Sequence, residues 1–125
     1  MPGDDLRKAL ETVVSSRNCD AAFVLSGIGS LGDAKLRRAG TAQPDELAGP
    51  LEILSVAGTI AICGSHLHMS VADAQGRVIG GHVANGCIVR TTAEVLLALL
   101  TEWTFSREPD ATTGYKELVA RRKAV

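Results

Sequence analysis

All three histidines of this 125-residue chain lie within seventeen consecutive positions. They are His66, His68 and His82, and the DAQG sequence from Asp73 to Gly76 separates the second from the third. Neutral imidazole nitrogens bind several first-row divalent metals. Three such ligands leave one coordination position free for water or a substrate, which is the pattern of a catalytic site. The spacing therefore raises the question of whether the fold brings the three rings together.

The DAQG sequence predicts a β-hairpin with all three histidines on one face. Asp is favoured at the first position of a type I turn and Gly at the fourth, and a left-handed glycine there gives the common bulged hairpin. If Asp73 pairs with Arg77, then His68 faces His82 directly and His66 lies two residues along the same strand. The other face then carries apolar residues and one glycine: Leu67, Met69, Val71, Ile79, Gly81 and Val83.

Strand geometry places these side chains within reach of one ion. Positions i and i+2 on a strand lie about 6.5 to 7 Å apart, and directly opposed Cβ atoms lie about 5 Å apart. Inward-pointing imidazoles at such positions can meet a metal at about 2.0 to 2.1 Å. Zn²⁺ is the expected ion, with Mn²⁺, Fe²⁺, Ni²⁺ and Cu²⁺ left open. The alternative is three half-exposed histidines that hydrogen-bond to neighbours or water.

Other residues are candidates for ligand binding and catalysis. Gly80 and Gly81, next to His82, would leave the site open and let a ligand approach the backbone. Arg107 would hold a carboxylate or phosphate through two parallel hydrogen bonds. Glu52 or Glu94 would act as general base on a metal-bound water. The alternative for these charged residues is a surface or inter-subunit ion pair.

Composition limits the class of protein. Apolar residues make up 46% of the chain and charged residues 22%, which predicts a single globular domain over residues 1–125 rather than a disordered chain. The longest apolar run, VLLALL from Val95 to Leu100, is far shorter than the roughly 20 residues of a membrane helix, and no secretory leader precedes Asp4, so we expect a cytoplasmic protein. A net charge of -1 and 3% aromatic residues do not favour nucleic-acid binding.

The first half of the chain predicts one helix followed by strands. The DDLRKALETVVSSRN sequence from Asp4 has apolar residues at helical spacing. Two extended pieces, Ala21–Ile28 and Ala34–Ala39, are expected next, joined through glycines. The SGIGS sequence from Ser26 to Ser30, at the end of the first piece, could cradle a phosphate with its backbone amides, but it lacks the following helix and the GK(S/T) ending of a P-loop and is more typical of a turn or bulge. A loop around Pro44 and Pro50 should lead to two β-rich runs in LEILSVAGTIAIC, separated by a glycine turn.

The second half contains one ambiguous segment. Thr91 and Glu94 in TTAEVLLALLTEWTF resemble a helix capping box, but the apolar residues alternate and also fill the opposite face. We interpret this segment as a strand that other subunits partly bury. In the TGYKELVARRK tail, Tyr115, Leu118 and Val119 have helical spacing, which predicts a short C-terminal helix.

The chain resembles the plants-and-prokaryotes-conserved (PPC) domain family over nearly its whole length. The resemblance is carried by PGDDLRKAL, VLSGIGSLGDAKLRRAG, PLEILSVAGTI, HLH, GRVIGGHVANGCIVRTTAEV and REPDATTGYKEL. It implies an α/β fold of the α+β type, with a mostly antiparallel sheet of about seven strands, assembled as a homotrimer. It also implies the prokaryotic, stand-alone branch, in which the histidines at the positions of His66, His68 and His82 form a metal site. The family has no established activity.

Two departures from the family pattern bear on function. Relatives carry an additional strand before the helix that begins at PGDDL, so we expect one sheet edge to be shortened or differently covered. Plant relatives carry an AT-hook for DNA, and the basic segments Arg37–Arg38 and Arg121–Lys123 lack its glycine. Our first hypothesis is therefore a homotrimeric metal-dependent binder or enzyme for a small anionic molecule. The alternative is a non-catalytic, oligomeric interaction or DNA-binding module.

Overall fold

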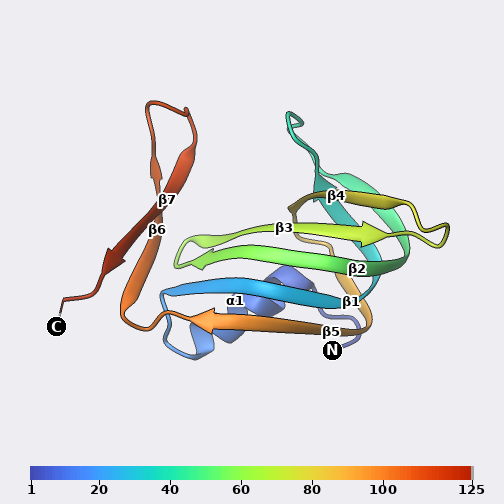
Figure 1. The fold of residues 1–125 in the computed structure, drawn as a ribbon, viewed down its shortest axis with the longest axis horizontal. Helices are drawn as coiled ribbons and strands as arrows, with labels where there is room; N and C mark the ends of the chain where they lie inside the picture. Colours follow the sequence, from blue (N-terminus) through green and yellow to red (C-terminus); the bar gives the residue numbers. More distant parts are fainter. Residues whose placement is uncertain (125) are drawn as a thin grey trace.

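A computed structural model describes residues 1–124 of the chain (Figure 1). Its elements are one helix followed by seven strands. In chain order they are α1 (Leu6–Ser16), β1 (Ala21–Arg37), β2 (Asp45–Ala61), β3 (Gly64–Ala72), β4 (Val78–Val83), β5 (Ile88–Leu99), β6 (Trp103–Pro109) and β7 (Lys116–Arg122). Every ladder between these strands is antiparallel, which confirms the predicted mostly antiparallel sheet with an N-terminal helix.

Helix α1 is amphipathic, as its sequence predicts, and Asp5 caps its N-terminus. The Asp5 carboxylate accepts a hydrogen bond from the backbone N–H of Lys8 at 3.2 Å, which satisfies one of the free donors at the helix start. Leu6, Leu10 and Val14, spaced by four residues, are buried against the sheet. Within residues 1–124, no helix has the length and apolar character needed to cross a membrane.

Four strands close on themselves around the core. β1 pairs with β2, β2 with β3 and β3 with β4, and β4 returns to β1 through the pairs Leu36–Val83 and Arg37–His82. β5 pairs with β1 beside this ring. The inward side chains of the ring and the buried face of α1 form one apolar cluster, which includes Leu31, Leu51 and Leu67. The ring therefore has an apolar inside, and its outward face remains available for polar side chains.

β1 and β2 are longer than the sequence suggested. β1 runs unbroken through the glycines of the SGIGS sequence, and its pairing with β5 shifts register between Val24 and Ser26 and again after Gly29. The bulge interpretation of that sequence is thus confirmed, whereas the separation into two pieces was wrong. β2 likewise continues from Asp45 through the expected loop and through Gly58. A side chain at Gly58 would place its Cβ 2.0 Å from the carbonyl oxygen of His66, so a close strand approach, and not a turn, requires this glycine.

The C-terminal segment forms a hairpin instead of the predicted helix. β7 pairs with β6 along its length, with Leu118 opposite Arg107. Leu118 packs on a second apolar cluster that contains Phe105, and Tyr115 is 76% exposed, so the apolar residues at helical spacing do not share a buried face. In Figure 1 the hairpin (orange to red) stands beside the end of the sheet where β2 turns into β3. The ambiguous TTAEVLLALLTEWTF segment is extended rather than helical, as interpreted, but it turns after Leu99 and is divided between β5 and β6; its burial by other subunits stays a prediction.

Candidate metal centre

The β3–β4 hairpin has the register that its turn residues predict. The backbone N–H of Gly76 donates to the carbonyl of Asp73 at 2.9 Å, and the N–H of Asp73 donates to the carbonyl of Arg77 at 3.0 Å. Gly76 has a φ of 78°, the left-handed conformation expected for a bulged turn. As a result, His68 pairs with His82 across the ladder.

The three histidine side chains converge on the outward face of the sheet. Side chains on β3 alternate strictly, with Leu67 and Met69 in the core and His66 and His68 outside. One nitrogen from each of the three rings lies within 4.8 Å of the others. The ring centroids of His66 and His82 are 5.2 Å apart, and the Nε2 atoms of His66 and His68 are 3.1 Å apart. The rings thus form one compact cluster of nitrogen donors.

The state of these rings fits metal ligation. The Nδ1 atom of His82 is buried and has no hydrogen-bond partner among residues 1–124, and such an atom needs an additional partner. Burial, together with His66 and the nearby Arg37 and Arg7, lowers the pKa of His82 to about 4. Burial and the Arg107 guanidinium also lower the pKa of His66. Both rings are therefore neutral at pH 7, as a metal ligand must be.

Cationic side chains surround a hollow beside the histidines. A cavity of about 500 Å³ is lined by His66 and His82 on one side and by residues of α1, β1 and the C-terminal hairpin on the other. Its charged lining residues are Arg7, Arg37, Arg107, Lys116 and Glu117. A smaller hollow of about 260 Å³ contains His66 and His68 and shares Arg107 and Glu117 with the first. Four cations and one acid make this surface suited to an anionic group.

Arg107 lies beside the histidines, where the sequence analysis expected an anion-binding residue. β6 carries it to the site, and its Nη2 donates to the Thr59 hydroxyl at 2.8 Å. Thr59 pairs with His66 in the β2–β3 ladder, so the hydrogen bond holds the guanidinium next to that ring. Because a guanidinium has five donors, most of them remain available for a ligand.

The structure does not bring Glu52 and Glu94 to the histidines. Both line a separate hollow with Ile28 and Leu54, and none of the three histidines takes part in that lining. Glu52 pairs with Ala72 near the turn of the β3–β4 hairpin, four residues beyond His68, and Glu94 pairs with Ile28. Strand register thus places both residues elsewhere on the sheet within one chain, and the role of either as general base stays a prediction.

Glu117 is the acidic residue that the sequence analysis missed. It is half-buried on β7 and lines both histidine hollows. The expectation of a C-terminal helix gave no reason to place Glu117 near the histidines. The β6–β7 hairpin is what brings it there. A signal was available in the sequence: Asp110 and Gly114 form the turn between β6 and β7, with the Asp110 carboxylate accepting from the N–H groups of Thr112 and Thr113.

Gly80 and Gly81 have a packing role. β4 lies between β3 and β1 at this point, and a Cβ at Gly81 would sit 2.8 Å from the carbonyl oxygen of Arg37. A Cβ at Gly80 would sit 3.2 Å from the carbonyl oxygen of Met69. Neither glycine lines the two hollows, so close strand packing explains both, and their contact with a ligand stays a prediction.

Comparison with known proteins agrees with this fold. A bifunctional protein GlmU from Synechococcus sp. (strain JA-3-3Ab) is 48% identical over 118 residues, which cover 94% of this chain and 19% of the relative. The chain thus spans about a fifth of the length of that curated relative. A hypothetical protein from Salmonella enterica has a TM-score of 0.95 and 39% identity, with coverage of 99% of this chain and 90% of that one.

A third similar protein is also a solved structure. It is described as a metal-containing protein from Archaeoglobus fulgidus, with a TM-score of 0.80, 27% identity and coverage of 95% of this chain and 88% of that one. The model of the Plants and Prokaryotes Conserved domain, abbreviated PCC or PPC, matches residues 1–101. With the fold and the histidine-bearing hairpin described above, this match shows that the chain belongs to the Plants and Prokaryotes Conserved domain family.

Proposed function

We propose that the protein is a homotrimeric metal-binding protein whose three-histidine site takes a small anionic ligand or substrate. The observation that carries the proposal is the convergence of His66, His68 and His82, with three donor nitrogens within 4.8 Å of one another. Three imidazole donors suit Zn²⁺ first among the divalent metals. The metal-containing relative from Archaeoglobus fulgidus supports a metal site in this branch of the family.

The surrounding residues divide the work of ligand binding. A metal bound here would polarise an oxygen of the ligand or lower the pKa of a bound water. Arg107, Arg37 and Lys116 would attract and orient an anionic group in the larger hollow. Glu117 replaces Glu52 and Glu94 as the carboxylate near enough to exchange a proton with the ligand, because it lines both histidine hollows.

An exposed apolar face supports the homotrimer that the family resemblance implies. Leu25 is 56% exposed, Ile28 55% and Leu96 61%, and together with Phe23 and Leu54 they lie on the adjacent strands β1, β2 and β5. We call these five residues the apolar face. Contiguous exposed apolar surface on a small protein marks an interaction site. Further copies of the chain would cover it.

Elemental analysis of protein purified without a histidine tag tests the metal proposal. We expect about one metal ion per chain in the wild type and a loss of the ion in His82→Ala, because two imidazoles hold a divalent metal far more weakly than three. Ser70→Ala is the matched control, since Ser70 lies on the same face of β3 as the histidines and its hydroxyl hydrogen-bonds to that of Ser55. Equal, sub-stoichiometric metal in all three proteins would contradict the proposal.

The second candidate is a DNA-binding or other interaction module. The cluster of Arg7, Arg37, Arg107 and Lys116 around one hollow favours it, because phosphate contacts are made by such cations. The net charge of -1 and the missing AT-hook oppose it. A mobility-shift titration across salt concentrations separates the candidates. A shift that weakens steeply with salt supports DNA binding, and no shift at micromolar protein in low salt contradicts it.

A further inference from the structure

The ladder that aligns His68 with His82 ends at that pair. β3 and β4 are paired from Ala72–Val78 to His68–His82 and no further. Beyond this point β4 turns toward β1, where Val83 pairs with Leu36. His66 therefore lies outside the ladder that positions the other two rings. The distance from His66 to His82 must be set by another contact.

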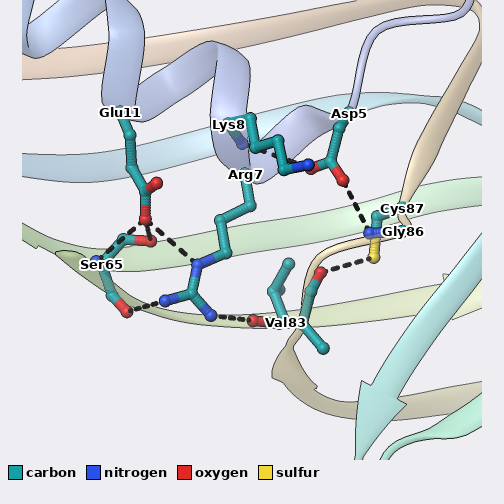
Figure 2. Close-up of polar contacts among 9 residues, drawn as sticks. Asp5, Arg7, Lys8, Glu11, Ser65, Val83, Gly86 and Cys87 are labelled. Carbon is teal, nitrogen blue, oxygen red and sulfur yellow. Dashed lines mark hydrogen bonds and ion pairs between the residues drawn. The ribbon is translucent and has the colours of Figure 1, made fainter.

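Arg7 of α1 spans the gap where the two strands separate (Figure 2). Its Nη1 donates to the carbonyl oxygen of Val83 at 3.0 Å, and its Nη2 donates to the carbonyl oxygen of Ser65 at 3.1 Å. Ser65 directly precedes His66 in the chain, and Val83 directly follows His82. One guanidinium thus joins the backbones next to two of the three histidines, in place of the missing strand-to-strand hydrogen bonds.

Glu11 holds the Arg7 guanidinium and the β3 backbone at the same time (Figure 2). Its Oε1 accepts from the Nε of Arg7 at 3.1 Å, from the backbone N–H of Ser65 at 3.1 Å and from the Ser65 hydroxyl at 2.6 Å. The side chains of Arg7 and Glu11 are 22% and 32% exposed, so the pair is largely shielded from solvent. Charge-assisted hydrogen bonds in such surroundings are stronger and geometrically more specific than exposed ones.

The start of α1 is anchored to the other strand as well. The Asp5 carboxylate accepts from the backbone N–H of Gly86 at 2.7 Å, in the loop that follows β4. The helix is therefore fixed to both sides of the gap that Arg7 spans. A guanidinium is planar and rigid, so the separation of its two terminal nitrogens fixes the separation of the two carbonyl oxygens.

We propose that Arg7 and Glu11 form a positioning clamp that sets the distance between His66 and His82 and thereby the metal affinity of the site. Arg7 lines the hollow beside the histidines, but the clamp ligates no metal and sets the ring spacing through the backbone next to His66 and His82. Its effect on affinity rests on the proposed metal function, whereas its effect on ring geometry does not. Outer residues that orient metal ligands change affinity by about 10- to 100-fold when they are replaced.

The test compares Arg7→Lys with Arg77→Lys by Co²⁺ titration. Lysine keeps the positive charge at position 7 but has a single ammonium group in place of two terminal nitrogens at a fixed separation. The substitution therefore removes the geometry of the clamp and keeps its charge. Arg77 is the matched control because it pairs with Asp73 at 2.7 Å at the opposite, turn end of the same hairpin. We expect the Co²⁺ dissociation constant to rise about tenfold or more in Arg7→Lys, with a changed visible absorption spectrum, and to stay at the wild-type value in Arg77→Lys.

A second variant and a metal-free measurement complete the test. Glu11→Gln keeps the guanidinium and weakens its support, so it should shift affinity in the same direction if Arg7→Lys fails to fold. In the metal-free proteins, the His66 and His82 ring resonances in NMR spectra should move in Arg7→Lys and Glu11→Gln but not in Arg77→Lys. Unchanged ring resonances and Co²⁺ affinity in both clamp variants would overturn the clamp. If the wild type binds no metal but the His66 and His82 resonances still move in the two clamp variants, only the proposed function is overturned.

Discussion

His68 and His82 face each other as a register pair across the β3–β4 ladder, with ring centroids 5.9 Å apart. His66 joins them from two residues further along β3, at a centroid distance of 4.8 Å from His68. The first contact forms wherever this hairpin folds, because the turn fixes the register. The position of His66 depends in addition on β2, through the Thr59–His66 pair, and on α1.

The lowered pKa of His82 predicts a pH-dependent stability of the metal-free protein. Folding lowers this pKa from the ordinary value of 6.5 to about 4, so between these pH values the unfolded chain binds a proton that the folded chain does not. The contribution of His82 to the free energy of unfolding is therefore fully present above pH 6.5 and is lost as the pH falls toward 4. Urea midpoints at pH 7, 5.5 and 4.5 measure the loss. We expect a smaller loss in His82→Gln, and an equal loss in both proteins would contradict the assignment.

Gly58 is predicted to be intolerant of any side chain. An added Cβ would lie 2.0 Å from the carbonyl oxygen of His66, and the residue has a φ of 144°. Gly58→Ala should lower the free energy of unfolding by about 1 to 3 kcal/mol and weaken metal binding, because β3 must move at His66. Gly80→Ala, whose nearest contact would be 3.2 Å, is the milder comparison. Thermal unfolding compares the melting temperatures of Gly58→Ala and Gly80→Ala. Equal melting temperatures for the two variants would refute the prediction.

The apolar face is predicted to hold the proposed trimer together. Leu96→Glu should yield monomers in light scattering, because a buried, unpaired carboxylate at an interface costs several kcal/mol. Val78→Glu is the control, since Val78 is similarly exposed at 62% but lies on β4, away from the apolar face. A trimer that persists in Leu96→Glu would exclude this face as the interface.

Arg107 is predicted to bind the anionic group of the ligand without holding the metal. Inorganic phosphate added to the Co²⁺-loaded protein should change the visible spectrum, and Arg107→Met should weaken phosphate binding by about 10- to 100-fold, as expected for lost charged hydrogen bonds. Co²⁺ affinity should stay unchanged. Arg90→Met, at an exposed position on β5, controls for the general loss of a positive charge. Equal phosphate binding in both variants would remove Arg107 from the site.

The parts of the site that the sequence predicted correctly depend on local chemistry. Asp73 and Gly76 determine a turn within four residues, and the turn determines the pairing of His68 with His82 without reference to the rest of the chain. The amphipathic α1 is local in the same sense, because Leu6, Leu10 and Val14 follow the helical period.

The parts that the sequence did not predict depend on contacts between distant segments. Leu118 and Val119 fit a helix by spacing alone, and pairing with β6 decides for a strand. The distance of Glu52 and Glu94 from the histidines depends on the long, bulged ladders that β1 makes with β2 and β5. No local sequence signal encodes those ladders, so the sequence alone could not place the two residues. Glu117 came to the site through the hairpin that the sequence analysis had assigned to a helix.

The histidines and their main cationic neighbour come from separate parts of the chain. The match to the family model ends at residue 101, whereas Arg107, Lys116 and Glu117 belong to the hairpin that follows it. The hairpin is nonetheless present in relatives, because the Salmonella enterica structure covers 99% of this chain. Substitutions confined to β6 and β7 would therefore change the charge beside the imidazoles while the six elements from α1 to β5 keep their sequence.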